Sequence, residues 1–354
     1  MSKPGALFCR LTGSGPGALA TTALWGDGAA DVLNSCFQPK GKTTPSTMDL
    51  SAILFGRLID PEAPEETGED VVVARTDETG FVIHGHGGAA AIARTARILS
   101  QLGAEESDVD HWRIHQNVSE ENRKILSTLE QAPTYRTASI LLDQFNGAGR
   151  RTQERIAQLH ADGKEVQAQA LEKRFYETKT IARHLLVPWR VVFIGRPNVG
   201  KSSLLNAILG FQRSIVNAQQ GTTRDLVQAQ TTIDGWLFEF VDAAGIRETT
   251  DELELEGVNR AKSAISEADL VMRLFDDADS MTTIERARTK ESFRIDVPTI
   301  DVMNKCDLAS ASQTDQSVLR VSAVDGSGIE ELLQTIVQTL IPNPPQPGDG
   351  VWLE

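Results

Sequence analysis

Apolar and polar positions alternate over short distances in the first part of the chain. Up to about Asp110, β-type runs at Gly5–Leu11, Val71–Arg75 and Gly80–Ile83 are separated by clusters of Gly, Pro and Thr. A run with helical spacing, Ala89–Leu102, follows them. We therefore predict a small α+β domain over residues 1–115.

From Ser119 to about Leu186 the sequence becomes charged and rich in Ala and Gln, with apolar residues at helical spacing. Residues with this spacing include Ala138, Leu141, Leu142 and Phe145. Turns are expected at Pro133 and at Gly147–Gly149, and the last helix of this stretch is expected over Leu171–Leu186. The pattern predicts a helical linker domain over residues 116–187.

After Pro188 short runs typical of buried strands alternate with helical segments. The strands are expected at Arg190–Ile194, Leu237–Val241, Leu270–Phe275, Thr299–Met303 and Val318–Val321. This alternation predicts a mostly parallel sheet with helices on both faces, over residues 188–341. The proline-rich segment Pro342–Gly348 predicts an extended tail within residues 342–354.

Composition narrows the classes of function. With 40% hydrophobic and 24% charged residues the chain has a globular composition, and no apolar run approaches the roughly 20 residues that cross a bilayer. The first residues lack a secretory signal, so we expect a cytoplasmic protein without a membrane partner. A net charge of −14 argues against a broad nucleic-acid footprint, and any RNA contact is expected to be local. The three cysteines have no paired spacing, which argues against disulfides and zinc.

The first candidate site follows the strand Arg190–Ile194. The residues Gly195-Arg196-Pro197-Asn198-Val199-Gly200-Lys201-Ser202 fit the phosphate-binding pattern G-x-x-x-x-G-K-[ST]. Gly195 and Gly200 allow the backbone to curl closely round phosphates, Lys201 would neutralise the β- and γ-phosphates, and the Ser202 hydroxyl would bind Mg²⁺. The predicted GTP contacts here are Asn198, Val199, Gly200, Lys201, Ser202 and Ser203. The alternative is a chance match in a glycine turn.

Two further segments, in the expected order, resemble nucleotide switches. Gly221-Thr222-Thr223-Arg224-Asp225 offers hydroxyls on a glycine-hinged loop that could close on the γ-phosphate and its Mg²⁺. Asp242-Ala243-Ala244-Gly245 ends a strand, so Asp242 can hold Mg²⁺ through water while the Gly245 N–H meets the γ-phosphate. We include Gly221, Thr222, Thr223, Asp242 and Gly245 among the predicted GTP contacts.

The base is predicted to bind where two later strands end. In Asn304-Lys305-Cys306-Asp307 the terminal carboxylate can accept hydrogen bonds from N1–H and the 2-amino group of guanine, a donor pair that adenine lacks. Ser322 and Ala323 suit a backbone contact to guanine O6. Five elements in this order predict a GTP-binding and GTP-hydrolysing protein, with its site between about Arg190 and Leu340.

The amino-acid sequences of these motifs resemble those of a known protein family. The most specific stretches are GRPNVGKSSLLNAIL (Gly195–Leu209), GTTRD (Gly221–Asp225) and DAAGIRETTDELELEGVNRA (Asp242–Ala261). They resemble the MnmE/TrmE family of tRNA-modification GTPases, among the translation-factor-like small GTPases. The resemblance is strong from Arg190 to Leu340 and weak before it.

The resemblance implies a catalytic role for Glu254. In that family an Asp-x-Ala-Gly-[Leu/Ile]-Arg-Glu segment precedes Asp-Glu-x-Glu, whose final glutamate orients the attacking water; Glu254 matches it. The apolar Ile246 agrees, because it stands where many regulatory GTPases have a catalytic glutamine. The alternative for Glu254 is a solvated acidic helix face shared with Asp251, Glu252 and Glu256.

The resemblance also implies a K⁺ ion that takes the place of an arginine finger. Its expected ligands are Asn198 in the phosphate loop together with Asn217, Gln219 and Thr222, and Asn217 is a further predicted GTP contact. Thr223 is then the expected Mg²⁺ ligand of the first switch, beside Ser202 and Asp242.

Upstream, Gly68-Glu69-Asp70-Val71-Val72 and Ile83-His84-Gly85-His86-Gly87-Gly88 resemble the family's N-terminal folate-binding domain. A tight strand-to-helix turn explains the second segment equally well, and we favour that reading of His84 and His86. The Gly-Glu-Phe-Thr…Asn-Gly-Lys segment of the family has no counterpart between Leu102 and Ser119, which leaves a folate cofactor uncertain.

Two more departures bear on function. The family's C-terminal helical half, with its Cys-Ile-Gly-Lys tail, has no counterpart before Glu354, which puts the modification step in doubt. Ala243 replaces a usual threonine, and hydrolysis is expected to survive this change.

The leading hypothesis is a K⁺-stimulated GTPase of the wobble-uridine modification type, which forms homodimers through its N-terminal and G domains. A flavoprotein partner and tRNA are implied by the resemblance. The alternative is a GTP-dependent switch or assembly factor that has lost tRNA-modifying activity. A ribosome-assembly GTPase like Era or EngA is less favoured, because no KH-like domain follows Leu340.

Overall fold

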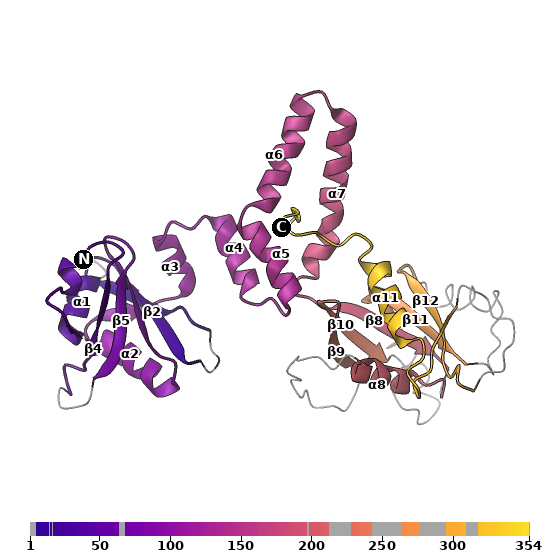
Figure 1. Ribbon diagram of the computed structural model, residues 1–354, viewed down its shortest axis with the longest axis horizontal. Coiled ribbons are helices and arrows are strands. Elements are labelled where there is room, and N and C mark those ends of the chain that lie inside the picture. Colours follow the sequence, from indigo (N-terminus) through magenta and orange to yellow (C-terminus); the bar gives the residue numbers. More distant parts are fainter. Residues whose placement is uncertain are drawn as a thin grey trace. The chain divides into compact units, whose positions relative to one another are not determined.

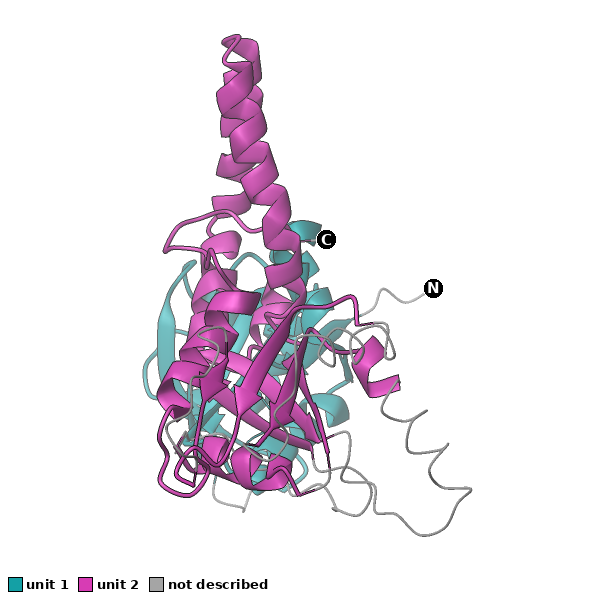
Figure 2. Ribbon diagram, turned by 90° about the vertical axis from the view of Figure 1, so that its right-hand side faces the viewer, with its two compact units in different colours: residues 1–124 teal, residues 125–354 magenta. Residues whose placement is uncertain are grey.

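The computed structural model describes residues 5–13, 15, 17–63, 68–196, 198–211, 228–242, 263–276, 295–308 and 318–353. The chain divides into two compact units, residues 1–124 and 125–354, which Figure 2 distinguishes by colour. Each unit has its own sheet, in accordance with the prediction of an α+β part followed by a nucleotide-binding α/β part.

The first unit contains a seven-stranded sheet in the order β3-β4-β5-β6-β2-β1-β7 (Figure 1). Its strands are β1 Ala6–Arg10, β2 Leu19–Trp25, β3 Phe37–Pro39, β4 Ile53–Leu58, β5 Glu69–Arg75, β6 Gly80–His86 and β7 Ala104–Glu106. All neighbours are antiparallel except β1 and β7. The expected strands at Gly5–Leu11, Val71–Arg75 and Gly80–Ile83 are confirmed within β1, β5 and β6.

Helices cover both faces of this sheet. The helices are α1 Ala29–Cys36, α2 Ala89–Gln101, α3 Val109–His115 and a short 3₁₀ turn, η1 Pro45–Thr47. Leu33 of α1 and Ile98 of α2 are buried in one cluster with strand residues such as Phe81. On the opposite face, Trp112 of α3 packs against Trp25 of β2, with ring centroids 5.4 Å apart.

Three helices of the second unit confirm the helical prediction: α5 Tyr135–Phe145, α6 Ala148–Ala161 and α7 Glu165–Arg183. The helix α4 Glu120–Leu129 spans the boundary between the units. A capping box at Thr134 begins α5, and Gly147, at φ +85°, supplies the left-handed turn before α6. The helices α6 and α7 form a hairpin that is conspicuous in Figure 1.

The second sheet has six strands in the order β13-β12-β11-β8-β10-β9. They are β8 Trp189–Gly195, β9 Gln228–Ile233, β10 Trp236–Asp242, β11 Leu270–Phe275, β12 Thr299–Met303 and β13 Leu319–Arg320, and the described helices of this part include α8 Lys201–Phe211 and α11 Ile329–Leu340. Only β9 is antiparallel to its neighbour. The mostly parallel sheet is therefore confirmed.

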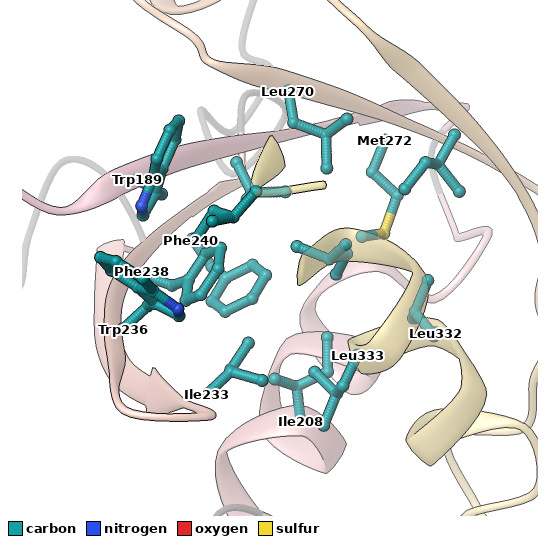
Figure 3. Close-up of a cluster of buried hydrophobic side chains, with 14 of the residues drawn as sticks. Trp189, Ile208, Ile233, Trp236, Phe238, Phe240, Leu270, Met272, Leu332 and Leu333 are labelled. Carbon is teal, nitrogen blue, oxygen red and sulfur yellow. The ribbon is translucent and has the colours of Figure 1, made fainter. Parts of the chain in front are cut away.

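The core of the second unit lies where α8 and α11 pack on one face of this sheet. Figure 3 shows Trp236, Phe238 and Phe240 of β10 beside Ile208 of α8 and Leu333 of α11. A second cluster on the other face joins Val192 and Val241 to residues 264, 265 and 268. Both faces are therefore covered, which explains why these strands read as continuous apolar runs.

The turn between β9 and β10 is held by the start of α5. Asp234 and Gly235 have φ of +47° and +75°, as a two-residue turn of the I′ type requires. The Thr134 hydroxyl donates to Gly235 O at 2.6 Å, and Arg136 Nη2 lies 3.1 Å from Asp234 Oδ1. The nucleotide-binding sheet is thus joined to the start of α5 by contacts between residues about 100 positions apart in the chain.

The segment after α11 also returns to the helices, which the sequence did not indicate. Buried Gln144 of α5 donates through Nε2 to Asp349 O at 3.0 Å and accepts from the Val351 N–H at 2.9 Å. Trp352 packs against Phe175 of α7, with ring centroids 5.4 Å apart. The last described residues therefore belong to the folded second unit.

A buried histidine marks the passage from α7 into β8. His184 stacks on Trp189 at 3.7 Å between ring centroids, and its Nε2 lies 3.4 Å from Asp269 Oδ1. The Arg190 N–H donates to the other carboxylate oxygen at 2.8 Å. Burial alone would raise the pKa of Asp269, but these two contacts outweigh burial and the pKa lies below its ordinary value.

Candidate functional site

The candidate site lies at the carboxyl ends of the parallel strands, where ligands of open α/β sheets bind. The phosphate loop follows β8, Asp242 ends β10, and Asp276 directly follows β11. Asn304 follows β12, and Ser322 comes two residues after β13. The sheet topology thus brings to one edge residues that are up to about 130 positions apart in the chain.

Close packing explains why the phosphate loop has glycine at its two fixed positions. Gly195 has φ +155°, and a Cβ there would overlap the carbonyl oxygen of Leu274 on β11. Gly200 has φ +93°, and a Cβ there would overlap Asn304 Nδ2. Asn198 also has a positive φ, +64°. The loop is therefore pressed against β11 and the segment after β12, and only glycine fits at these two contacts.

Lys201, the first residue of α8, turns its side chain back onto the loop. Its Nζ donates to Gly195 O and to Arg196 O, each at 2.9 Å, and the residue is only 6% exposed. Burial lowers the pKa of the Lys201 ammonium, and the Asp242 carboxylate opposes this effect. A buried cation inside a curl of backbone is suited to an anionic ligand, whose charge would offset the cost of its burial.

Ser202 and Asp242 fit an Mg²⁺ site. Ser202 Oγ donates to Asp242 Oδ2 at 3.0 Å, and Asp242 is buried while Ser202 is exposed. The carboxylate lies within hydrogen-bonding reach of the hydroxyl, so a Mg²⁺ bound to the hydroxyl could hold a water that donates to the carboxylate. The chemistry of this donor set, one hydroxyl and one carboxylate, is that of a magnesium site completed by phosphate oxygens.

The residues after β12 hold the phosphate loop by donating hydrogen bonds to its carbonyl groups. Buried Asn304 donates through Nδ2 to Val199 O at 3.0 Å and to Gly200 O at 3.4 Å. Lys305 Nζ donates to Asn198 O at 2.8 Å. Three consecutive carbonyls of the loop are thus held by the segment after β12, an arrangement compatible with N–H groups that bind an anion.

The residues predicted to recognise guanine lie at the same edge. Asp307 is exposed within the turn that the Leu308 N–H closes on Lys305 O, at 3.0 Å. Buried Ser322 accepts through Oγ from the N–H groups of Val324 and Asp325, which shapes the loop that carries Ala323. Among the described residues, Asn304 Oδ1 is buried without a hydrogen-bond partner, so an acceptor is available at this end of the site.

The structure thus brings together many of the residues chosen from sequence. These are Asn198, Val199, Gly200, Lys201, Ser202, Ser203, Asp242, Asn304, Lys305, Asp307, Ser322 and Ala323. Seven other chosen residues lie outside the described residues: Asn217, Gln219, Gly221, Thr222, Thr223, Gly245 and Glu254. Ala243, Ile246 and the acidic neighbours of Glu254 also lie outside them. Asp276 was missed, although an acid directly after a buried strand could have suggested it.

In the first unit, the two histidines of β6, His84 and His86, have structural partners. His84 Nδ1 lies 2.9 Å from the Thr21 hydroxyl, and Glu69 Oε1 accepts from the His86 N–H at 2.9 Å. Gly87 lies so close to Gly17 O that a Cβ could not fit. These contacts agree with the strand-to-helix turn expected between β6 and α2, and folate binding stays a prediction.

Comparison with known proteins places the chain in a family. A family model described as "50S ribosome-binding GTPase" matches residues 190–305. The tRNA modification GTPase MnmE of Moorella thermoacetica is 30% identical over 374 residues, which cover 93% of this chain and 80% of that protein. The chain belongs to the MnmE family. MnmE of Synechococcus sp. (strain RCC307) is 29% identical over 369 residues, 94% of this chain and 80% of the relative.

Two solved structures are also similar. Era of Aquifex aeolicus bound to GDP and AlF4⁻ has 29% identity and a TM-score of 0.35 over 47% of this chain and 62% of that one. The G domain of the T. maritima FeoB iron transporter has 25% identity and a TM-score of 0.31 over 42% of this chain and 97% of that one.

As an MnmE family member with a complete phosphate loop, the chain is an enzyme that hydrolyses GTP to GDP and phosphate, and it binds GTP with Mg²⁺. The described part of the chain contains no helix that is both long and apolar enough to span a bilayer.

Proposed function

We propose that this MnmE-family GTPase is stimulated by K⁺ and acts in the modification of the wobble uridine of tRNA. The observation that supports the chemical part of this proposal is the grip of Asn304 and Lys305 on the carbonyls of residues 198–200. Because this grip fixes the loop before nucleotide binds, the cost of ordering the site is already met by the fold.

In this proposal each described residue has a defined task. The N–H groups of residues 198–203 bind the phosphates, and Lys201 exchanges its two carbonyl partners for phosphate oxygens. Ser202 and Thr223, with Asp242 through a water, would hold Mg²⁺, which would supply positive charge to offset the negative charge of the phosphates. Asp307 selects guanine over adenine, and calorimetry should show at least about a hundredfold preference for GDP over ADP. Equal affinities would contradict the whole assignment.

We assign K⁺ binding to Asn198, with Asn217, Gln219 and Thr222. The support is that Asn198 is exposed on the rim of the loop while its backbone is fixed in a left-handed conformation by Lys305. GTP turnover should be about tenfold or more faster in K⁺ than in Na⁺ at equal ionic strength.

The K⁺ test has a matched control within the same helix-loop segment. Asn198→Ala should abolish the difference between K⁺ and Na⁺, whereas Asn206→Ala, at an exposed position of α8, should keep it. Equal turnover of the unmodified protein in the two salts would rule out the K⁺ mechanism and leave the GTPase assignment intact.

We assign Glu254 to orientation of the attacking water. Glu254→Ala should retain GTP affinity and lose about a hundredfold or more of turnover, because the loss affects only the transition state. Glu256→Ala, which removes a neighbouring charge of the same acidic segment, should retain turnover. If both variants behave alike, Glu254 belongs to a solvated acidic face.

The role in tRNA is proposed from the family alone. It includes a homodimer through the N-terminal and G domains, a flavoprotein partner, a folate derivative as a further cofactor, and a cytoplasmic location. Mass spectrometry of tRNA from a deletion strain tests it, with the gene for the intact chain and for Lys201→Met returned in parallel. A wobble-uridine defect restored only by the intact gene supports it; unaltered tRNA would instead support a GTP-dependent switch or assembly factor.

A further inference from the structure

Asp276 makes a contact that none of the sequence motifs includes. It directly follows β11, and its Oδ2 accepts from Lys305 Nζ at 2.7 Å. The same Nζ donates to Asn198 O at 2.8 Å. One ammonium group therefore joins the end of β11, the segment after β12 and the phosphate loop after β8.

The backbone at two of these three points is in an uncommon conformation. Asn198 has φ +64° and Lys305 has φ +61°, both in the left-handed region that non-glycine residues seldom adopt. Such conformations are strained and persist only where surrounding contacts hold them. The bond from Lys305 Nζ to Asn198 O joins these two residues directly, and Asp276 fixes the position of the ammonium that makes it.

The Asp276 carboxylate also keeps the Lys305 ammonium in place when a nucleoside triphosphate binds. The side chain of Lys305 is 36% exposed, and that of Asp276 is 19% exposed. A triphosphate would attract a mobile ammonium and draw it off the Asn198 carbonyl. The short ion pair with Asp276 opposes this, because an ammonium that moved to the phosphates would leave a largely buried carboxylate without its counter-charge.

We propose that Asp276 is a positioning residue for GTP binding, which holds the Lys305 side chain against the phosphate loop and so keeps the Asn198 carbonyl turned away from the nucleotide. Asp276 acts through Lys305 and need not touch the nucleotide. The inference depends on GTP binding by this site and is independent of K⁺, of Glu254 and of tRNA.

The test measures the affinity of the full-length chain for GDP and for a non-hydrolysable GTP analogue by calorimetry, together with steady-state GTP hydrolysis. Asp276→Ala should weaken both affinities about tenfold, while kcat stays within about twofold, because the loss affects binding and transition state alike. Asp276→Asn keeps an acceptor oxygen, and its affinity for both nucleotides should fall only about threefold.

A double-mutant cycle separates positioning through Lys305 from a general structural effect. In the Lys305→Ala background, adding Asp276→Ala should weaken binding by less than about twofold. Glu330→Gln, which removes an exposed acid from the start of α11, serves as the charge control and should bind like the unmodified chain. Thermal unfolding of each variant without nucleotide reports whether the fold is retained.

Three results would overturn the proposal. Unchanged affinity in Asp276→Ala would show that Lys305 needs no such anchor. Losses that multiply in the double variant would show that Asp276 acts without Lys305. Equal losses in Asp276→Asn and Asp276→Ala, accompanied by equally lowered melting temperatures, would assign the effect to folding. If the unmodified chain failed to bind guanine nucleotides, the GTPase assignment would fail first.

Discussion

The fit of Gly200 against Asn304 gives a prediction that can be worked out from the structure. In Gly200→Ala, the new Cβ would overlap Asn304 Nδ2, and the residue would remain at φ +93°. Asn304 cannot move aside without giving up its bonds to Val199 O and Gly200 O, at 3.0 and 3.4 Å. The substitution therefore acts on the backbone and on the buried amide at the same time.

The magnitude follows from these two costs. A non-glycine residue in the left-handed region costs roughly 1–2 kcal/mol. Loss of the Asn304 bonds leaves buried polar groups unsatisfied, at about 1–3 kcal/mol. The sum is about 2–5 kcal/mol. If the loop relaxes to avoid it, the loss appears in nucleotide affinity, as about thirtyfold to several thousandfold at 1.4 kcal/mol per factor of ten.

The energetic cost can appear as lower nucleotide affinity or as lower stability of the fold. Calorimetric titration with GDP and Mg²⁺ measures the first, and thermal unfolding of the nucleotide-free protein measures the second. Gly210→Ala is the matched control, since Gly210 lies in α8 with nothing within 4 Å of an added Cβ. The control should bind normally and unfold at the same or a higher temperature, because alanine favours a helix by about 1 kcal/mol over glycine. Unchanged affinity and an unchanged melting temperature in Gly200→Ala would refute the steric argument.

Three further predictions concern buried polar groups. Lys201→Met should raise the melting temperature of the nucleotide-free protein, because burial lowers the pKa of the ammonium and its charge is costly in the fold. GDP affinity should fall at least about a hundredfold. A lower melting temperature would contradict this reasoning. Because the pKa of Asp269 is lower in the folded protein than the value of about 3.9 in the unfolded chain, its carboxylate stabilises the fold above about pH 4, and this stabilisation is lost as the pH falls through the folded pKa. The loss of stability in Asp269→Asn, measured by urea unfolding, should therefore be full at about pH 6 and shrink below about pH 4. Gln144→Ala should cost about 2–3 kcal/mol in the same assay, and Gln153→Ala, exposed on α6, about none.

Much of the nucleotide-binding fold follows from local sequence. Strands β8, β10, β11 and β12 are buried on both faces, so they appear as continuous apolar runs and were predicted. The edge strand β9, Gln228–Ile233, was missed because it is mostly polar and two of its six positions are exposed, so it lacks a continuous apolar run. In the first unit β2 and β4 were missed as well. Their Gly, Thr and Arg residues obscure the alternation that marks a strand.

The site divides in the same way. The phosphate loop and the Asn304–Asp307 segment depend on short fixed spacings, so the sequence alone indicates them. The bond of Lys305 to Asp276 and the return of Asp349 and Val351 to Gln144 join residues 29 to 207 positions apart. No local pattern records which of several similar side chains will meet across the fold. Such contacts could not be predicted from one sequence.

The turn at Asp234 and Gly235 fixes the start of β10 to the start of α5. The strand β10 runs from this turn to Asp242, a length of about 23 Å at 3.3 Å per residue. Because Thr134 and Arg136 hold the turn and residues 238–242 pair with β8, we expect the strand to keep Asp242 at a fixed distance from the start of α5. The start of α5 therefore holds one end of a strand whose other end carries the carboxylate that we propose for Mg²⁺ binding.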